Sequence, residues 1–201
     1  YRTDLRWKVP DDLKEILEND IFEKPFRRGK YILIPTKKDN ILLIHLGMSG
    51  QIKIKESVPT LLKHDHIRII IENKNNNLFS ITYNDPRRFG YVDYLNKRDL
   101  KKHFLLKSLG VEPFSEDLTK VYLHNIFKKK TTNIKNALLD QKIIAGIGNI
   151  YASEILFRAK IRPHRNVNSL ESKDLELIIN STKEILKKSI KKGGTTIKDH
   201  K

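Results

Sequence analysis

The spacing of apolar residues changes once along this chain, and that change constrains the fold more than any other feature. Up to Asn96, short β-branched runs alternate with turn residues, whereas beyond it apolar residues recur at helical spacing. Strands repeat every two residues and helices every 3.6. The sequence therefore predicts an α+β chain, with a β domain over residues 1–107 and an all-helical domain over residues 108–201.

Several segments of the first half carry the strand pattern: Tyr31 to Pro35, Ile41 to Leu46, Gln51 to Lys55, His66 to Glu72 and Leu78 to Tyr83. Turn residues separate them at Asp39-Asn40, Gly47 to Gly50 and Asn73 to Asn77. One short helix is expected at Asp11 to Glu18, after Pro10. These signals favour an antiparallel, β-sandwich-like domain.

Helical spacing dominates the second half. Its apolar positions are Leu118, Tyr122, Ile126, Ile134, Ala137 and Leu138, and then a longer face from Leu175 to Ser189 that ends at Gly193-Gly194. Ser115 and Asn133 are placed as N-caps. A glycine-rich turn, Ala145 to Asn149, leads into a helix at Ile150 to Ala159.

The composition favours a polyanionic partner. Forty Lys and Arg against 24 Asp and Glu give a formal net charge of +16, which attracts nucleic acid. The alternative is that a Lys-, Ile- and Asn-rich chain reflects only an AT-rich genome. With no cysteine and no apolar stretch long enough to span a membrane, we expect a cytoplasmic protein without disulfides or a thiolate zinc site. Because the chain starts at Tyr1 and stops at Lys201, both ends are expected to be cuts.

Two segments of the β half suit contact with a sugar or a base. Arg27 to Tyr31 is a basic cluster that leads into a strand, so Lys30 could meet a phosphate or sugar unless the cluster is solvated surface. His45 to Gly50 carries the only methionine, Met48, on a glycine-bracketed turn. An apolar tip of this kind can wedge between stacked bases, although a Met on a hairpin can also fill a core gap.

Two further segments suit contact with phosphate. In Lys63 to His66, the histidine His64 could bind a phosphate beside Lys63, be structural, or pair with His66 on a metal; no third ligand is evident, and no metal is expected. In Asn84 to Gly90, Arg87 could grip a phosphate while Phe89 stacks on an exposed base. The alternative is solvated arginines and a Phe89 packed in the core.

In the helical half, Lys128 to Lys130 precede a helix, and Gly146 to Asn149 open another. A helix N-terminus offers unpaired N–H groups and positive dipole charge, so this turn is a plausible phosphate-binding site. The same glycine spacing also serves ordinary helix–helix turns.

Together, these segments resemble the formamidopyrimidine-DNA glycosylase family over nearly the whole chain. The matching segments, in order and spacing, are Arg28 to Tyr31, His45 to Gly50, Lys63 to His66, Asp85 to Gly90 and Asp140 to Glu154. The resemblance implies a monomer that grips damaged double-stranded DNA in the cleft between a β-sandwich-like domain and a helix-two-turn-helix domain.

The resemblance also implies residue roles. Met48, Arg87 and Phe89 would fill the space left by a flipped nucleotide. His64, Arg87, Lys130 and Asn149 would bind phosphates, with Lys129 as the alternative to Lys130. Lys30 would be a catalytic residue near the sugar of the target nucleotide.

The family removes oxidised purines, namely formamidopyrimidine and 8-oxoguanine, and cleaves the strand at the abasic site by β,δ-elimination. Its nucleophile is an N-terminal proline, and a cysteine-ligated zinc ion holds a C-terminal finger. Neither feature matches these residues. We therefore expect the 201-residue chain to bind damaged DNA without excising bases, with a residual lyase activity through Lys30 conceivable. The alternatives are a non-catalytic nucleic-acid-binding remnant and an RNA-associated structural protein.

Overall fold

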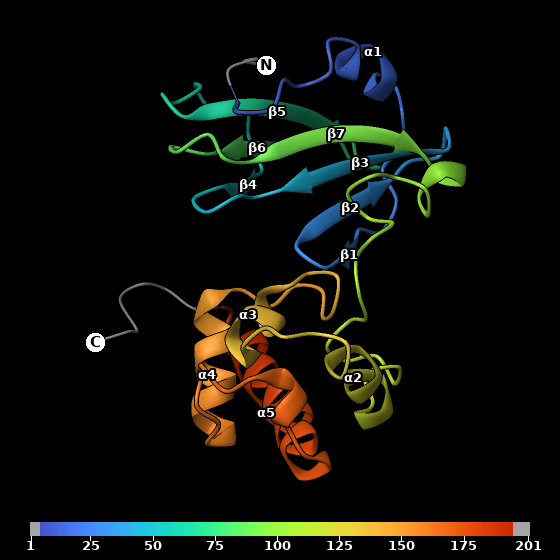
Figure 1. The fold of residues 1–201 in the computed structure, drawn as a ribbon. Helices are drawn as coiled ribbons and strands as arrows, with labels where there is room; N and C mark the ends of the chain where they lie inside the picture. The colour runs from blue at the N-terminus through green and yellow to red at the C-terminus, as the bar shows by residue number, and fades with distance from the viewer. Residues whose placement is uncertain (1–4, 195–201) are drawn as a thin grey trace. The chain divides into compact units, whose positions relative to one another are not determined.

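The chain forms two compact units that divide between His103 and Phe104 (Figure 1). The computed structural model describes residues 5–194, so the two ends, where the sequence suggests cuts, lie outside the described residues. Strands, one short α-helix and the 3-10 helix Lys97–Asp99 make up the first unit, and helices make up the second. The α+β prediction is confirmed.

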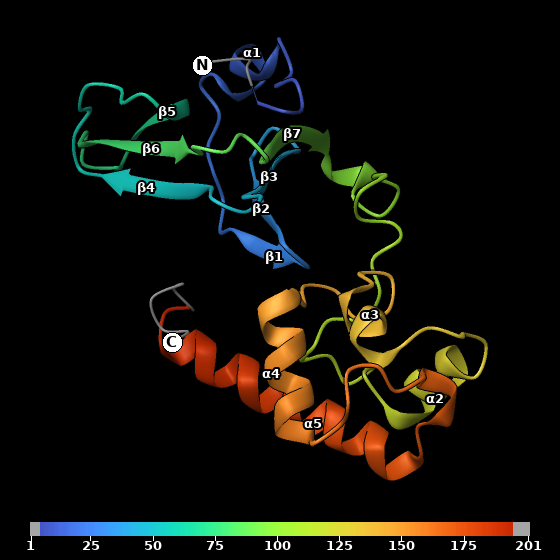
Figure 2. The same ribbon diagram turned by 60° about the vertical axis from the view of Figure 1, so that its left-hand side comes forward.

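Two antiparallel sheets build the N-terminal unit, and Figure 2 separates them clearly. One sheet has the order β1-β2-β3-β7, with bounds Phe26–Arg28, Tyr31–Pro35, Asn40–His45 and Tyr91–Asn96. The other has the order β4-β6-β5, with bounds Gln51–Lys55, Leu78–Asn84 and Asp65–Glu72. Helix α1, Leu13–Leu17, precedes them.

Both sheets contribute to one hydrophobic core. Leu42 and Ile44 come from β3, Val92 from β7, Ile67 from β5 and Tyr83 from β6. Leu5, Val9 and Leu13, from the segment before β1, are buried in the same cluster. The core therefore fixes the position of that segment as well as the packing of the sheets.

The sequence predicts β2 to β6 and misses β1 and β7. Strand β1 has only three residues, two of them arginines, so it shows no apolar alternation. Strand β7 reads Tyr-Val-Asp-Tyr-Leu-Asn, in which only the second and fifth residues are buried. Its position is set by pairing with β3, from Asn40↔Asn96 to His45↔Tyr91, and not by a local pattern.

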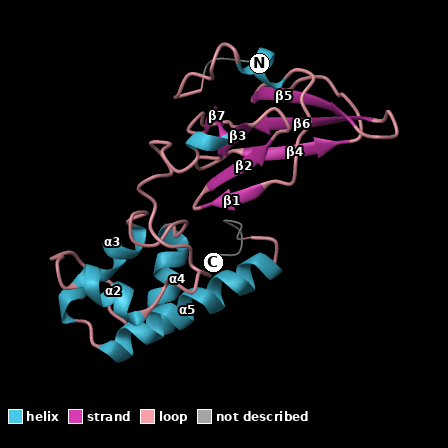
Figure 3. Cartoon of the chain, turned by 90° about the vertical axis from the view of Figure 1, so that its right-hand side faces the viewer, coloured by secondary structure: helices cyan, strands magenta, loops and turns pink. Residues whose placement is uncertain are grey.

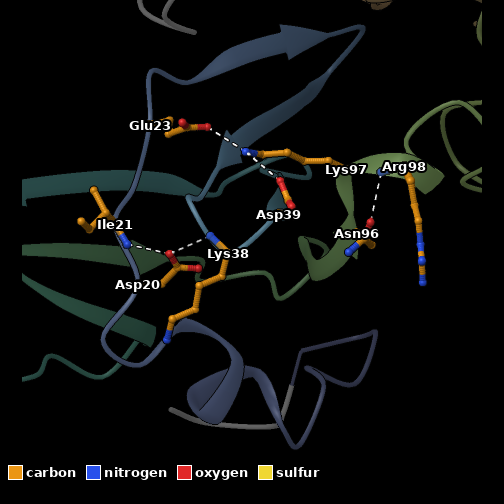
Figure 4. Close-up of polar contacts among 8 residues, drawn as sticks. All are labelled: Asp20, Ile21, Glu23, Lys38, Asp39, Asn96, Lys97 and Arg98. Carbon is orange, nitrogen blue, oxygen red and sulfur yellow. Dashed lines mark hydrogen bonds and ion pairs between the residues drawn. The ribbon is translucent and has the colours of Figure 1, made fainter.

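A polar network ties the segment before β1 to one end of the β3–β7 pair. Figure 4 shows Lys97 between Glu23, at 2.9 Å, and Asp39, at 3.7 Å. Asp20 accepts hydrogen bonds from the backbone N–H groups of Ile21 and Lys38. This network lies at the Asn96 end of the pair. The two loops that the sequence marks for ligand contact adjoin the opposite end, at His45 and Tyr91.

Four α-helices make up the C-terminal unit as far as the structure describes it (Figure 3): α2, Lys120–Phe127; α3, Ile134–Leu139; α4, Asn149–Ala159; and α5, Ser172–Lys191. A short 3-10 helix, Val167–Ser169, joins α4 to α5. Between α3 and α4 the chain makes two turns, separated by the bridge of Ile144 to Val111. This is the predicted helix-two-turn-helix arrangement. No helix within residues 5–194 is long and apolar enough to cross a bilayer.

The capping predictions have mixed outcomes. Asn133 caps α3, because its side chain accepts a hydrogen bond from the N–H of Asn136. Ser115 is wrong as the N-cap of α2: Thr119 holds that position and accepts from the N–H of Tyr122. Ser115 instead closes a local turn by accepting from the N–H of Asp117, the competing use that serine side chains favour outside helices.

We expect shortening of a buried side chain of α4 to destabilise the helical unit. Ile155 is fully buried, so Ile155→Ala should lower the free energy of unfolding of this unit by about 3 kcal/mol. Ile190→Ala removes the same atoms from an exposed site on α5 and should change it by less than about 0.5 kcal/mol. Urea denaturation followed by circular dichroism at the helix band measures both; equal effects would contradict this core assignment.

Candidate nucleic-acid interface

The turn between β3 and β4 projects Met48 into solvent. Gly47 adopts φ +63°, and a Cβ placed there would lie 2.7 Å from the carbonyl carbon of Phe89. Glycine is therefore required both by the backbone conformation and by the close approach of a second loop. Met48 is 72% exposed, so it does not fill a core gap.

The second loop, between β6 and β7, carries Arg87 and Phe89. Arg88 adopts φ +60°, an uncommon conformation for a residue with a side chain. Phe89 is 39% exposed, and the guanidinium of Arg87 lies 5.0 Å from the centroid of its ring. The phenyl ring therefore lies at the surface under a cation and is not packed in the core.

A single carboxylate joins the two loops. Asp85, which is fully buried, accepts hydrogen bonds from the Ser49 hydroxyl at 2.5 Å, the Tyr83 hydroxyl at 3.0 Å and the Gly90 N–H at 2.8 Å. The Ser49 hydroxyl oxygen in turn accepts from the N–H of Arg87 at 3.2 Å. The Met48 turn and the Arg87–Phe89 loop are thus held in a fixed relation.

This network depends on the ionised form of Asp85. Burial opposes ionisation, but hydrogen bonds from Ser49, Gly90 and Tyr83 outweigh it and hold the pKa of Asp85 below its ordinary value. Burial and the adjacent Asp85 charge raise the pKa of Tyr83, so that hydroxyl stays a donor. The carboxylate consequently accepts from all its partners at neutral pH.

The two neighbouring histidines differ in role. The Nε2–H of His66 donates to the carbonyl oxygen of Asp85 at 2.9 Å, and His66 is only 2% exposed, which makes it structural. His64 precedes β5, is half-buried, and accepts through its carbonyl oxygen from the N–H of Asp85. A register shift in the pairing of β5 with β6 lies between Asp65 and Ile67, beside the two histidines.

Lys30 lies just before β2, in the tight turn after Gly29. Its side chain remains exposed, yet partial desolvation by neighbouring protein lowers the pKa of its ammonium group. Desolvation and the nearby Lys30 charge also lower the pKa of His45. The neutral His45 ring accepts the N–H of Gly47 through Nδ1 at 3.1 Å, so one imidazole links the surroundings of Lys30 to the Met48 turn.

In the C-terminal unit, Lys130 and Asn149 flank the two turns. Lys130 is half-buried and its Nζ lies 3.4 Å from the Asp140 carboxylate, whereas Lys129 is exposed. Asn149 is exposed at the first position of α4, after Gly148 as N-cap. Gln141 shapes this helix entry, because its side chain donates to the carbonyl oxygen of Ile147 and accepts from the N–H of Gly146.

The structure thus groups Met48, Arg87 and Phe89 on one projection, hereafter the tip. The sequence does not reveal the residues that build it, since Ser49 and Asp85 are 36 positions apart and neither belongs to a periodic pattern. Arg6 was also missed, although its guanidinium lies 5.8 Å from the centroid of the Phe89 ring. Residues 5–194 hold no group of three or more His, Asp or Glu that could bind a metal ion, and the sequence has no cysteine.

We expect Asp85→Asn to destabilise the N-terminal unit by about 2 kcal/mol at pH 7, because an amide offers one acceptor oxygen to three donors. Because the folded pKa of Asp85 is depressed, its contribution is present above the unfolded pKa, about 3.9, and is lost as pH falls through the folded value. The difference between wild type and variant should therefore shrink below about pH 4.

Trp7, the only tryptophan, reports on this unit alone, so urea denaturation followed by its fluorescence at several pH values makes the measurement. Asp11→Asn, at an exposed carboxylate, is the control. A wild-type advantage over Asp85→Asn that does not change between pH 7 and pH 3 would show that the charge of Asp85 is irrelevant.

Both units match models of one family. Residues 1–92 match the formamidopyrimidine-DNA glycosylase N-terminal domain, and residues 109–201 match the formamidopyrimidine-DNA glycosylase H2TH domain. The chain is 42% identical to the formamidopyrimidine-DNA glycosylase of Ruthia magnifica over 99% of its length and 71% of the relative's. Against that of Roseobacter denitrificans, the identity is 38%, over 100% of this chain and 72% of the relative.

Solved structures of glycosylases of this family are also similar to this chain. The Lactococcus lactis formamidopyrimidine-DNA glycosylase bound non-covalently to DNA containing an AP site has a TM-score of 0.84 and 33% identity, covering 93% of this chain and 69% of that one. MutM in complex with DNA containing carbocyclic 8-oxo-G has a TM-score of 0.83 and 34% identity, covering 93% and 68%. The chain therefore belongs to the formamidopyrimidine-DNA glycosylase family of base-excision DNA repair.

Proposed function

We propose that these 201 residues recognise a damaged nucleotide in duplex DNA by inserting the tip, Met48, Arg87 and Phe89, into the space that the flipped nucleotide leaves. The supporting observation is that Met48 and Phe89 are exposed although both are apolar, on loops that a buried carboxylate holds together. Flipping a nucleotide costs a few kcal/mol of stacking, and a preformed apolar wedge offsets part of it.

Polar and charged groups of each unit would bind the DNA backbone. In the N-terminal unit we assign phosphate contacts to Arg87 and His64. In the C-terminal unit we assign them to Asn149 and Lys130. Asn149 opens α4, whose first turn offers N–H groups and dipole charge to an anion, and Lys130 is a cation. Lys129, which is exposed, is the alternative to Lys130. The net charge of +16 would add sequence-independent attraction.

The proposed substrates are those of the family, oxidised purines in duplex DNA. The reaction is attack of an amine on the anomeric carbon, departure of the base, and strand cleavage from the resulting Schiff base by β,δ-elimination. The resemblance gives the first step to an N-terminal proline, for which these residues offer no counterpart. We therefore propose that the isolated 201-residue polypeptide binds damaged DNA as a monomer without releasing the base.

Lys30 is the residue of this chain that we assign to the catalytic site, near the sugar of the target nucleotide. Its lowered pKa makes a neutral, nucleophilic amine more accessible than at an ordinary lysine. We place the structural zinc ion implied by the resemblance outside these 201 residues. Since the proposed partner is DNA and the relatives are bacterial, we propose that the protein acts in the bacterial cytoplasm.

The main rival is a nucleic-acid-binding remnant without lesion recognition, which would use only the basic surface. It predicts equal affinity for intact and damaged duplexes. An RNA-associated structural protein would instead prefer RNA in competition. Both rivals leave the exposed Met48 and Phe89 without a role, which is why we favour lesion recognition.

We expect this chain to bind a duplex with one abasic-site analogue more tightly than the same intact duplex at every salt concentration. Phe89→Ala should reduce that preference about tenfold, since stacking of an aromatic side chain on a base contributes about 1–3 kcal/mol. Phe114→Ala, at a residue of similar exposure (43% against 39%), is the control. Equal and steeply salt-dependent binding of both duplexes would support the remnant instead.

We also expect borohydride to trap a covalent adduct between this chain and abasic DNA through Lys30. Lys30→Ala should lose the adduct, while Lys97→Ala, at an ion-paired lysine of the same unit, should keep it. Duplex containing 8-oxoguanine should bind without base release. Release of that base above the level of Lys30→Ala would overturn the proposal of binding without excision.

A further inference from the structure

The segment before α1 contacts the tip. The N–H of Arg6 donates to the carbonyl oxygen of Arg88 at 2.9 Å, directly within the Arg87–Phe89 loop. The exposed Arg6 guanidinium lies 5.8 Å from the centroid of the Phe89 ring, and the Arg87 guanidinium lies 5.0 Å from the same centroid. Two cationic side chains therefore lie near one aromatic ring.

The core holds Arg6 in this place. Leu5 and Val9, on either side of it, are both buried in the N-terminal core, and Trp7 packs edge-on against Tyr91 of β7 with ring centroids 6.0 Å apart. The backbone of Arg6 is thus fixed at three neighbouring points. Its exposed side chain lies near the Phe89 ring.

We propose that Arg6 is a fourth residue of the DNA-contacting tip: it orients the Phe89 ring by stacking and binds a phosphate beside the inserted wedge. A guanidinium is suited to both tasks, because it is planar, permanently charged and able to donate two parallel hydrogen bonds to phosphate oxygens. This inference rests on the proposed insertion of the tip into damaged DNA. It adds a residue outside the loops that the family resemblance marks.

The two roles have separate signatures. A phosphate contact contributes to binding of every duplex, and its loss reduces the salt dependence of binding by about one ion. Orientation of Phe89 contributes only where the ring enters the stack, so it affects the preference for the lesion. Arg6→Lys keeps the charge but loses the planar stacking group, and it separates the two.

The experiment measures binding of wild type, Arg6→Ala and Arg6→Lys to intact duplex and to duplex with one abasic-site analogue across a salt series. Arg98→Ala, which removes an exposed arginine at the opposite end of the β3–β7 pair, is the control for charge alone. The urea midpoint from Trp7 fluorescence should be checked for each variant, because Arg6 neighbours the reporter.

We expect Arg6→Ala to weaken binding to the damaged duplex roughly tenfold and to lower the salt slope by about one. Arg6→Lys should keep the wild-type salt slope and lose part of the lesion preference, and in a Phe89→Ala background it should cause no further loss. Arg6→Ala behaving as Arg98→Ala on both duplexes would overturn the inference. If wild type shows no lesion preference, the proposed function fails, while the salt slope on intact duplex still decides whether Arg6 binds phosphate.

Discussion

The organisation of the N-terminal unit around the tip depends on the buried carboxylate of Asp85. Three donors from three chain segments meet on it: Ser49 from the turn after β3, Tyr83 from β6, and Gly90 from the loop directly before β7. A buried carboxylate without partners would be strongly unfavourable, so the ion keeps these segments together or becomes protonated. The same interaction that stabilises the unit therefore also sets the spacing between Met48 and Phe89.

Close packing around Tyr83 explains one glycine in each loop, Gly50 and Gly90. A Cβ at Gly90 would collide with the hydroxyl of Tyr83, and one at Gly50 would meet the carbonyl oxygen of Leu46 and the same hydroxyl. A side chain at either position would displace the phenol that donates to Asp85. Gly50 and Gly90 are thus required by sterics around one buried hydrogen bond, and flexibility of the loops is not needed to account for them.

Helices and strands with a strong apolar periodicity could be predicted from the sequence. A strand fixed by pairing with a distant strand, and an N-cap for which two residues compete, could not. Strand β2 follows from Tyr31 to Pro35 alone, whereas β7 exists because β3 offers an edge along its whole length. Thr119 displaces Ser115 as N-cap because Ser115 is used in its own turn. For the candidate site, local chemistry predicted the exposed residues Met48, Arg87 and Phe89. It could not predict Ser49, Asp85 or Arg6 as their supports, since contacts between residues far apart in sequence leave no local pattern.

Charge and shape supply different parts of the proposed activity. A net charge of +16 raises affinity for any nucleic acid and is weakened by salt, so it cannot by itself distinguish a lesion from intact duplex. Discrimination needs a group whose contact forms only when a base has left the stack, and Phe89 is the group to which the proposed function gives this role. Its usefulness depends on being in place beforehand, because ordering a free loop on binding would consume part of the stacking energy. The network of Asp85, Ser49 and Arg87, with Arg6 near the ring, fixes the loops without DNA. In the proposed function, this is how a buried carboxylate would support selective recognition.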